Sequence, residues 1–501
     1  MHVATRWPWN LGGALALTVV LGSSALAAPN RPLPHHAHVN GLGTSCVTVP
    51  MPESAFTPHL GEVSRVLYLE RCVGGCTVRG GAINDARTMT SAIPQTGSMA
   101  SFPEFTNHLG ETGAAADAEW NAFVSCVRKV YSYYDVEVTD QRPVGGPSYH
   151  LNLVSGTPGL IGLPNGTLGI SPFACRAQDN VISFSFANAH SKLDADSYVQ
   201  DLCWTATHEA GHAYSLEHAW TYTDGRSACN DPMSYPTGAC NTLRYFRNEP
   251  VNCGGFSPEP CVCGSTQNSH AKLLGVFGAG TPSVAPPTVE IVNPAPNAQV
   301  GLFVNADAGS PRGISRVELF INGYEWGEAK GAPFGQNGQP TPFTYSVRIP
   351  DELPGGVLDI MVRAYDDIGA STDSAVVTAM KGAPCASADS CAPGQACEAG
   401  KCFWDAPSGE IGDACTYPQF CLSGKCQGTA TQQICTQACI LGVTDSCPVG
   451  LECIEAGPGN PICFPPVEDS GGCSAGAATS PLAAIGLGAL ASLVLFRRRR
   501  R

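Results

Sequence analysis

The sequence predicts three folded parts in order: an α/β domain, an all-β sandwich and a small disulfide-rich region. The cysteines predict the boundaries, because eleven lie between Cys46 and Cys263, none lies in residues 264–384, and twelve lie between Cys385 and Cys463. The first part mixes helical and strand-like hydrophobic patterns, whereas the cysteine-free part shows only the alternation typical of strands. A chain of 501 residues is long enough for several domains.

The composition narrows the class of protein. Charged residues make up only 14% of the chain, and 56 Gly and 40 Pro favour loops and β-structure. The formal net charge is −14, and five of the 28 positive charges are the terminal arginines, so the rest of the chain is more acidic still. Nucleic acid is therefore a poor partner. Twenty-four cysteines indicate an oxidising compartment outside the cytosol.

The N-terminus predicts export. Residues 1–28 hold Arg6, the apolar run LGGALALTVVLGSSALA and a small-residue cleavage site at Ala25–Ala27, which is the pattern of a signal peptide. An N-terminal membrane anchor is the alternative, but the apolar run is short and ends in that site. Residues 29–62 are interpreted as an arm or short pro-segment; metal binding through "PHHAH" is the other interpretation.

Residues 63–277 show the patterns of the α/β domain. "RVLYLERC" predicts a strand, and residues 117–134 place five apolar side chains on one helical face: Trp120, Phe123, Val124, Val127 and Val130. "VEVTD", "SYHLNLV" and "VISFSFA" predict three strands, and "DSYVQDLCWTATHEAGHAYSL" predicts a second helix. The predicted order is therefore strand, helix, three strands and helix.

Residues 278–287 are a Pro/Gly/Ser linker, and about seven short strands are expected in residues 288–381. Asn322-Gly323 predicts a tight hairpin turn there. This stretch resembles bacterial Ig-like modules, which implies a spacer or adhesion role. Residues 385–464 hold twelve cysteines and no histidine, which argues against a zinc knuckle and favours six disulfides in one or two small modules.

Residues 471–501 form a three-part tail: "GGCSAGAATSP", the apolar run "LAAIGLGALASLVLF" and five arginines. This pattern resembles the C-terminal sorting tail of myxobacterial surface proteins. The resemblance implies processing near Cys473, and then display at the cell surface (outer membrane) or release. The alternative is a permanent tail anchor, and in either case the membrane is contacted only through this tail.

The segment "THEAGHAYSLEH" (residues 207–218) carries the candidate chemistry. Residues four apart on a helix lie only ~40° apart around its axis, so His208 and His212 face one point and can bind one Zn²⁺. Glu209 lies beside that point, where a general base must be. His218 can join them only if the helix ends near 214–216, which requires a left-handed residue at or next to Ser215.

These residues resemble the metzincin pattern His-Glu-x-x-His-x-x-Gly-x-x-His at each defined position except Ser215. The resemblance extends to "NDPMSY", where Met233 matches the methionine turn and Tyr235 matches a tyrosine near the metal in some metzincin families. It implies a zincin fold, Zn²⁺ as cofactor, Glu209 as general base and Tyr235 as a hydrogen-bond donor to the reaction's oxyanion. Met233 is expected to contribute packing.

Two functions fit these residues. The first is an exported zinc endopeptidase that acts on proteins or peptides. The second is a surface adhesin or structural protein with an inactive zincin domain; the retained Glu209 favours the first. One cysteine of the eleven must lack a partner inside the domain, and Cys46 is the candidate, as a free thiol, an interdomain disulfide or a cap on the zinc. Cys229 and Cys240 flank the methionine and are expected either to pair or to bind other partners.

Overall fold

A computed structural model describes residues 45–50, 63–190, 194–235, 244–331, 342–351, 353–404, 407–428, 432–443, 446–456 and 460–466. The predicted signal peptide, most of the N-terminal arm and the sorting tail with Cys473 lie outside these ranges. Two compact units are present, divided between Phe403 and Trp404. In the described ranges, no helix is both long and apolar enough to cross a membrane.

A six-stranded mixed sheet, ordered β1-β8-β9-β7-β2-β6, forms the centre of the first unit. Its strands are β1 (Ser45–Pro50), β2 (Val66–Glu70), β6 (Glu137–Thr139), β7 (His150–Val154), β8 (Thr167–Phe173) and β9 (Ile182–Ser185). Strands β2, β6, β7 and β9 are parallel, whereas β8 runs antiparallel to β9 and β1 runs parallel to β8. The sequence predicted the four parallel strands; β8 and β1 were not predicted.

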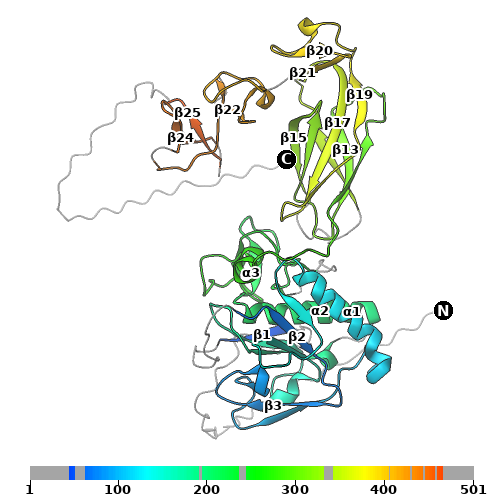
Figure 1. Cartoon of the computed structure of the whole chain (residues 1–501), viewed down its shortest axis with the longest axis vertical. Helices are drawn as coiled ribbons and strands as arrows, with labels where there is room; N and C mark the ends of the chain where they lie inside the picture. Colours follow the sequence, from blue (N-terminus) through cyan, green and yellow to red (C-terminus); the bar gives the residue numbers. More distant parts are fainter. Residues whose placement is uncertain are drawn as a thin grey trace, which may run out of the picture. The chain divides into compact units, whose positions relative to one another are not determined.

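Helices α1 (Asp117–Tyr131) and α2 (Ala195–Ala213) pack against each other (Figure 1), and α2 also contacts β7, β8 and β9. All five apolar residues predicted for one face of α1 are buried, so that prediction is confirmed. The disulfide Cys126–Cys203 joins the two helices. Asp194 caps α2 by accepting a hydrogen bond from the Ser197 backbone N–H, and the C-terminal half of α2 is fully buried.

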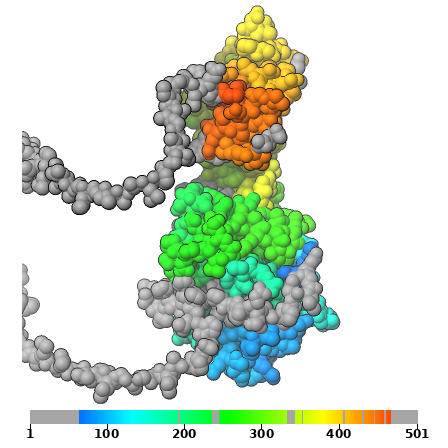
Figure 2. All heavy atoms as spheres, turned by 90° about the vertical axis from the view of Figure 1, so that its left-hand side faces the viewer, coloured from blue at the N-terminus to red at the C-terminus, as the bar shows by residue number. Residues whose placement is uncertain are grey.

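The other face of the sheet carries a small sheet of β3 (Cys76–Gly80), β4 (Thr90–Ser91) and β5 (Met99–Phe102). After α2 come β10 (Ala219–Tyr222), β11 (Val251–Cys253) and α3 (Ser269–Phe277). The described part of the segment from α2 to α3, coloured green, forms a broad lobe of the surface (Figure 2). Short 3-10 helices connect the strands at Ala86–Thr88, Gly113–Ala116, Pro158–Ile161 and Ala187–Ala189.

An all-β sandwich follows in the same unit. One sheet holds β12 (Thr288–Asn293), β13 (Phe303–Gly309) and β16 (Phe343–Arg348). The other holds β14 (Arg316–Ile321), β15 (Tyr324–Lys330), β17 (Gly356–Tyr365), β18 (Ser371–Asp373) and β19 (Val377–Lys381). The β14–β15 hairpin turns at Asn322 and Gly323, both with positive φ (51° and 87°), as predicted.

The cysteine-rich region contains the six predicted disulfides in three hairpins: β20 (Ala396–Glu398) with β21 (Lys401–Phe403), β22 (Cys426–Gly428) with β23 (Gln433–Cys435), and β24 (Glu452–Glu455) with β25 (Pro461–Phe464). Each hairpin contains two cysteines and two more precede it; in each set of four, the first pairs with the third and the second with the fourth. The repeat is therefore threefold. The first hairpin belongs to the first unit and the other two form the second.

Candidate metal centre

Three histidine rings converge at the end of α2. The Nε2 atom of His212 lies 2.9 Å from that of His208 and 3.2 Å from that of His218. One ring nitrogen from each of the three lies within 4.8 Å of the others. His208 and His212 are fully buried, and His218 is 9% exposed. The helical spacing and the turn therefore bring together the three residues that the sequence singled out.

The backbone fixes which nitrogen of each α2 histidine faces the centre. His208 Nδ1 lies 2.8 Å from the carbonyl oxygen of Pro232, and His212 Nδ1 lies 2.7 Å from that of Leu216. A carbonyl oxygen only accepts, so each Nδ1–H must donate and each Nε2 keeps its lone pair. Burial lowers the pKa of His208 to about 3 and that of His212 well below its ordinary value, so both rings are neutral at pH 7.

Lone pairs of neutral nitrogens aimed at one point repel each other unless a cation lies between them. Zn–N bonds of ~2.0–2.1 Å in a tetrahedral site separate ligand nitrogens by about 3.3 Å. The observed Nε2 separations of 2.9 and 3.2 Å are close to this value. The residues therefore fit a single Zn²⁺ ion with three protein ligands, and three ligands leave a fourth position for water or substrate.

Glu209, the residue after His208 on α2, is fully buried and lies against strand β8. A Cβ atom on Gly169 would lie only 2.5 Å from Glu209 Oε1 and 2.6 Å from its Cγ. Only glycine at position 169 therefore leaves room for the Glu209 side chain in this position. Gly169 could not be singled out from the sequence, because β8 itself was not predicted.

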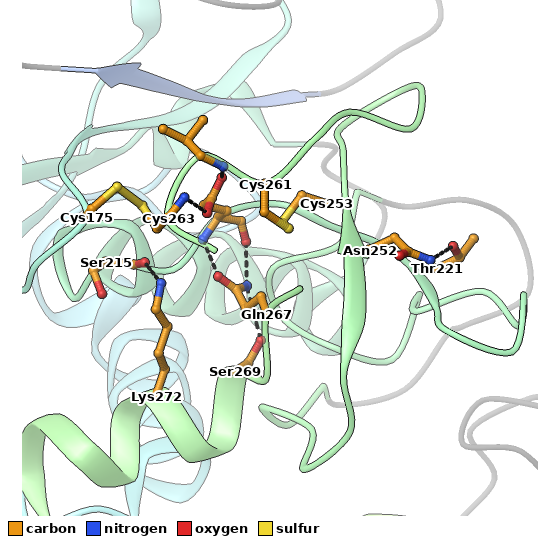
Figure 3. The surroundings of a disulfide bond; sticks show 12 residues. Cys175, Ser215, Thr221, Asn252, Cys253, Cys261, Cys263, Gln267, Ser269 and Lys272 are labelled. Carbon is orange, nitrogen blue, oxygen red and sulfur yellow. Dashed lines mark hydrogen bonds between the residues drawn. A yellow bond between two sulfur atoms is a disulfide. The ribbon is translucent and has the colours of Figure 1, made fainter. Parts of the chain in front are cut away.

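The turn that carries His218 to the centre has the conformation expected of it. Helix α2 ends at Ala213, and Ser215 has a φ of 74°, so the prediction of a left-handed residue here is confirmed. The Leu216 backbone N–H donates to the carbonyl oxygen of Gly211 at 3.0 Å, which closes the helix end. Lys272 Nζ donates to the carbonyl oxygen of Ser215 at 2.7 Å and braces this strained residue from α3 (Figure 3).

Glu217, the residue before His218, is held on two sides. Its backbone N–H and C=O both bond the side-chain amide of Gln267, at 2.6 and 2.8 Å. Its carboxylate accepts the backbone N–H groups of Val262 and Cys263, at 2.7 and 2.8 Å. The disulfide Cys175–Cys263 ties the loop that donates these N–H groups to the chain just after β8. These contacts fix the backbone at His218, and sequence reasoning missed all of them.

Met233 is fully buried and packs against helix α2 at Gly211. A Cβ atom on Gly211 would lie 2.6 Å from Met233 Sδ, so this glycine, located between Glu209 and His212, allows the close packing. Asp231 holds the turn, since its Oδ1 accepts the Met233 backbone N–H at 2.8 Å. Cys229 is disulfide-bonded, and Cys240 lies outside the described residues.

Tyr235 is buried with its ring against two of the three histidines. Its ring centroid lies 4.5 Å from that of His218 and 5.8 Å from that of His208, stacked on the latter. Phe256, which is 38% exposed, stacks on the outer side of Tyr235 with centroids 4.5 Å apart. The loop that carries Phe256 is closed by the disulfide Cys253–Cys261. Phe256 is thus an aromatic residue at the surface beside the centre.

Strand β1 occupies the edge of the sheet nearest the centre. It pairs with β8 in parallel, with Cys46 in register with Gly169, and it also approaches α2. Gly169 is the residue that faces Glu209. An extended peptide that adds to an exposed sheet edge forms the same kind of backbone pairing. Residues 45–50 therefore lie where such a peptide would lie on β8.

Comparisons with known proteins identify one part of the chain. Residues 287–362 match the bacterial Ig domain family, so the sandwich is a bacterial Ig-like domain. No curated protein matches the chain.

Solved structures with low similarity include the fibronectin(III)-like modules of Clostridium thermocellum CbhA, which are 26% identical with a TM-score of 0.15. That match covers 20% of this chain and 47% of the CbhA chain, so this protein spans about half the length of the CbhA chain. Wild-type OgpA from Akkermansia muciniphila is 10% identical, with 64% of this chain and 95% of that chain covered and a TM-score of 0.19.

Proposed function

We propose that the chain is an exported zinc endopeptidase of the metzincin type that hydrolyses peptide bonds in proteins. The observation that carries the proposal is the convergence of three buried histidine rings, two of them on the helix that also carries the buried Glu209. His208, His212 and His218 would hold the metal. When bound, Zn²⁺ supplies a Lewis acid that acidifies water and polarises a peptide carbonyl.

The chain's own residues then handle protons and position. Glu209 takes a proton from the attacking water and passes it to the nitrogen of the leaving amine. Tyr235 donates a hydrogen bond to the oxygen that becomes negatively charged. The carbonyl oxygens of Pro232 and Leu216 keep His208 and His212 in one tautomer throughout the cycle. Met233 supports the centre by packing alone.

The sequence patterns of residues 1–28 and 471–501 support an activity outside the cell. The signal peptide directs export, and the tail around Cys473 holds the enzyme at the cell surface or releases it. The cysteine-rich hairpins, all disulfide-bonded, form stable extracellular modules. The competing function, an adhesin with an inactive zincin domain, is less favoured because Glu209 and the glycine that accommodates it are both retained.

Hydrolysis of casein or gelatin, with and without a zinc chelator, tests the proposal. The full chain after signal-peptide removal is expected to cleave casein, to lose this activity in 1,10-phenanthroline and to regain it when zinc is added back. Cleavage that persists with the metal removed would point to a different mechanism, and no cleavage of any protein by the zinc-loaded chain would favour the adhesin.

We expect His218→Ala to lower zinc content far below one per chain. The two remaining ligands on α2 supply only half of a tetrahedral set. Loss of an outer-shell partner lowers metal affinity ~10–100-fold, and loss of a direct ligand should lower it further. Metal analysis after dialysis measures the effect. Unchanged zinc in this variant would exclude His218 as a ligand.

Removal of residues 29–62 is expected to raise the rate of casein hydrolysis. A tethered strand competes with substrate at an effective concentration of roughly millimolar order. Its removal should therefore raise the rate of hydrolysis of dilute substrates about 10-fold or more. Removal of residues 29–44 alone leaves β1 in place and is the matched control, with no gain expected. Equal rates for the full chain and the 29–62 deletion would show that β1 does not block the edge of β8.

A further inference from the structure

The Ig-like domain contributes a buried charged pair to the α/β domain. Arg312 lies in the loop between β13 and β14, and Asp367 lies in the turn between β17 and β18. Arg312 Nε and Nη2 donate to the two carboxylate oxygens of Asp367 at 2.6 and 2.8 Å. Their side chains are 1% and 2% exposed. Two sequence-distant loops at one end of the sandwich thus form a bidentate ion pair that is shielded from water.

The partners of this pair belong to the α/β domain. Arg312 Nη2 also donates to the carbonyl oxygen of Phe246 at 2.8 Å, and its guanidinium carbon lies 4.5 Å from the ring centroid of Tyr133. Asp367 accepts the Asn248 backbone N–H at 3.2 Å. Burial alone would raise the pKa of Asp367, but Arg312 and Arg247 outweigh it and hold the pKa below its ordinary value. The pair is therefore charged, and groups of the α/β domain bond both of its members.

Arg247 connects this pair to the methionine turn. Its guanidinium donates to the carbonyl oxygen of Arg312 and lies 3.7 Å from Asp367 Oδ1, and its side chain is 4% exposed. Its backbone N–H donates to Asp231 Oδ2 at 2.9 Å, while Asp231 Oδ1 accepts the Met233 backbone N–H at 2.8 Å. One carboxylate oxygen of Asp231 therefore accepts a hydrogen bond from the methionine turn. The other accepts one from Arg247, which contacts the Ig-like domain.

The chain of contacts ends on a metal ligand. Pro232, between Asp231 and Met233, accepts the Nδ1–H of His208 at 2.8 Å. From this continuity we infer that Arg312 and Asp367 are positioning residues for the metal centre, so that the Ig-like domain is a structural part of the peptidase and not only a spacer. The inference rests on the zinc centre proposed above. It implies that loosening the pair shifts the methionine turn and reorients His208.

The test measures the metal and not the reaction. Zinc dissociation constants and the visible spectrum of the cobalt-substituted protein are compared for the full chain and for Asp367→Asn. Because outer-shell partners of metal ligands are worth ~10–100-fold in affinity, we expect roughly 10-fold weaker zinc binding and a shifted cobalt spectrum. A double variant, Arg312→Met with Asp367→Leu, replaces the pair by apolar side chains and serves if the single variant does not fold.

The control is Arg363→Ala, which removes a similar bidentate pair with Asp373 at 2.5 and 2.9 Å in the same domain. That pair is exposed (33% and 44%), and zinc binding should not change. Variants that lose thermal stability but keep the wild-type zinc affinity and cobalt spectrum would overturn the inference while leaving the peptidase proposal intact. A wild-type chain that binds no zinc would overturn both. A wild-type chain that binds zinc but cleaves no protein would refute only the peptidase proposal. The zinc affinity and the cobalt spectrum of the variants would still test the positioning role of Arg312 and Asp367.

Discussion

Glu209→Gln is expected to lower the rate of casein hydrolysis by a factor of about 10²–10⁴, the usual contribution of a positioned acid–base group. Glutamine keeps the length and shape of the side chain, so it fits the space that Gly169 leaves open. It cannot accept the proton of the attacking water. The three histidines are unchanged, and zinc content and thermal stability should therefore stay close to those of the wild type.

A matched variant separates this effect from the loss of a hydrogen-bonded carboxylate elsewhere in the domain. Glu119 on α1 bonds His108 Nδ1 at 2.6 Å, and Glu119→Gln should leave the rate of hydrolysis near the wild-type value. If Glu209→Gln retains its zinc and cleaves casein at the wild-type rate, Glu209 is not the general base. The observed proteolysis would then belong to another site.

His212→Ala is expected to remove the metal and the activity together. His212 lies between the other two ligands, with Nε2 separations of 2.9 and 3.2 Å, so its loss leaves His208 and His218 without the central member of the set. Zinc bound only by the native state stabilises that state by mass action, so the melting temperature in excess zinc should also fall.

His270→Ala controls for the loss of a buried imidazole. Burial lowers the pKa of His270 to about 4, and its Nδ1 lies 2.9 Å from the Tyr134 hydroxyl, in contacts that do not include the metal ligands. This variant should lose some stability and keep one zinc. A His212→Ala protein that retains zinc after dialysis would contradict the three-histidine assignment.

Local periodicity was sufficient to predict much of the site. The i, i+4 spacing of His208 and His212 determines their common face, and the geometry of an α-helix required the left-handed residue found at Ser215. The apolar face of α1 followed from the same periodicity. These features depend on residues close in sequence, which is why sequence reasoning found them.

The parts that were not predicted depend on distant residues or lack local signals. Strand β8, "TLGISPF", contains Gly169 and Pro172 and is buried on both faces, so it shows no polar–apolar alternation. The contact of Glu217 with Gln267 joins residues 50 positions apart, and that of Arg312 with Phe246 joins residues 66 positions apart. Such pairings follow from the tertiary fold and leave no spacing pattern in the sequence.

Titration of the metal-free protein with zinc, with bound metal and casein hydrolysis measured in the same samples, tests the central claim most directly. The account predicts that activity rises linearly with bound zinc and reaches its full value at one zinc per chain, held by His208, His212 and His218. Full activity in the metal-free protein, or one bound zinc that persists in the His208→Ala, His212→Ala and His218→Ala variants, would contradict it.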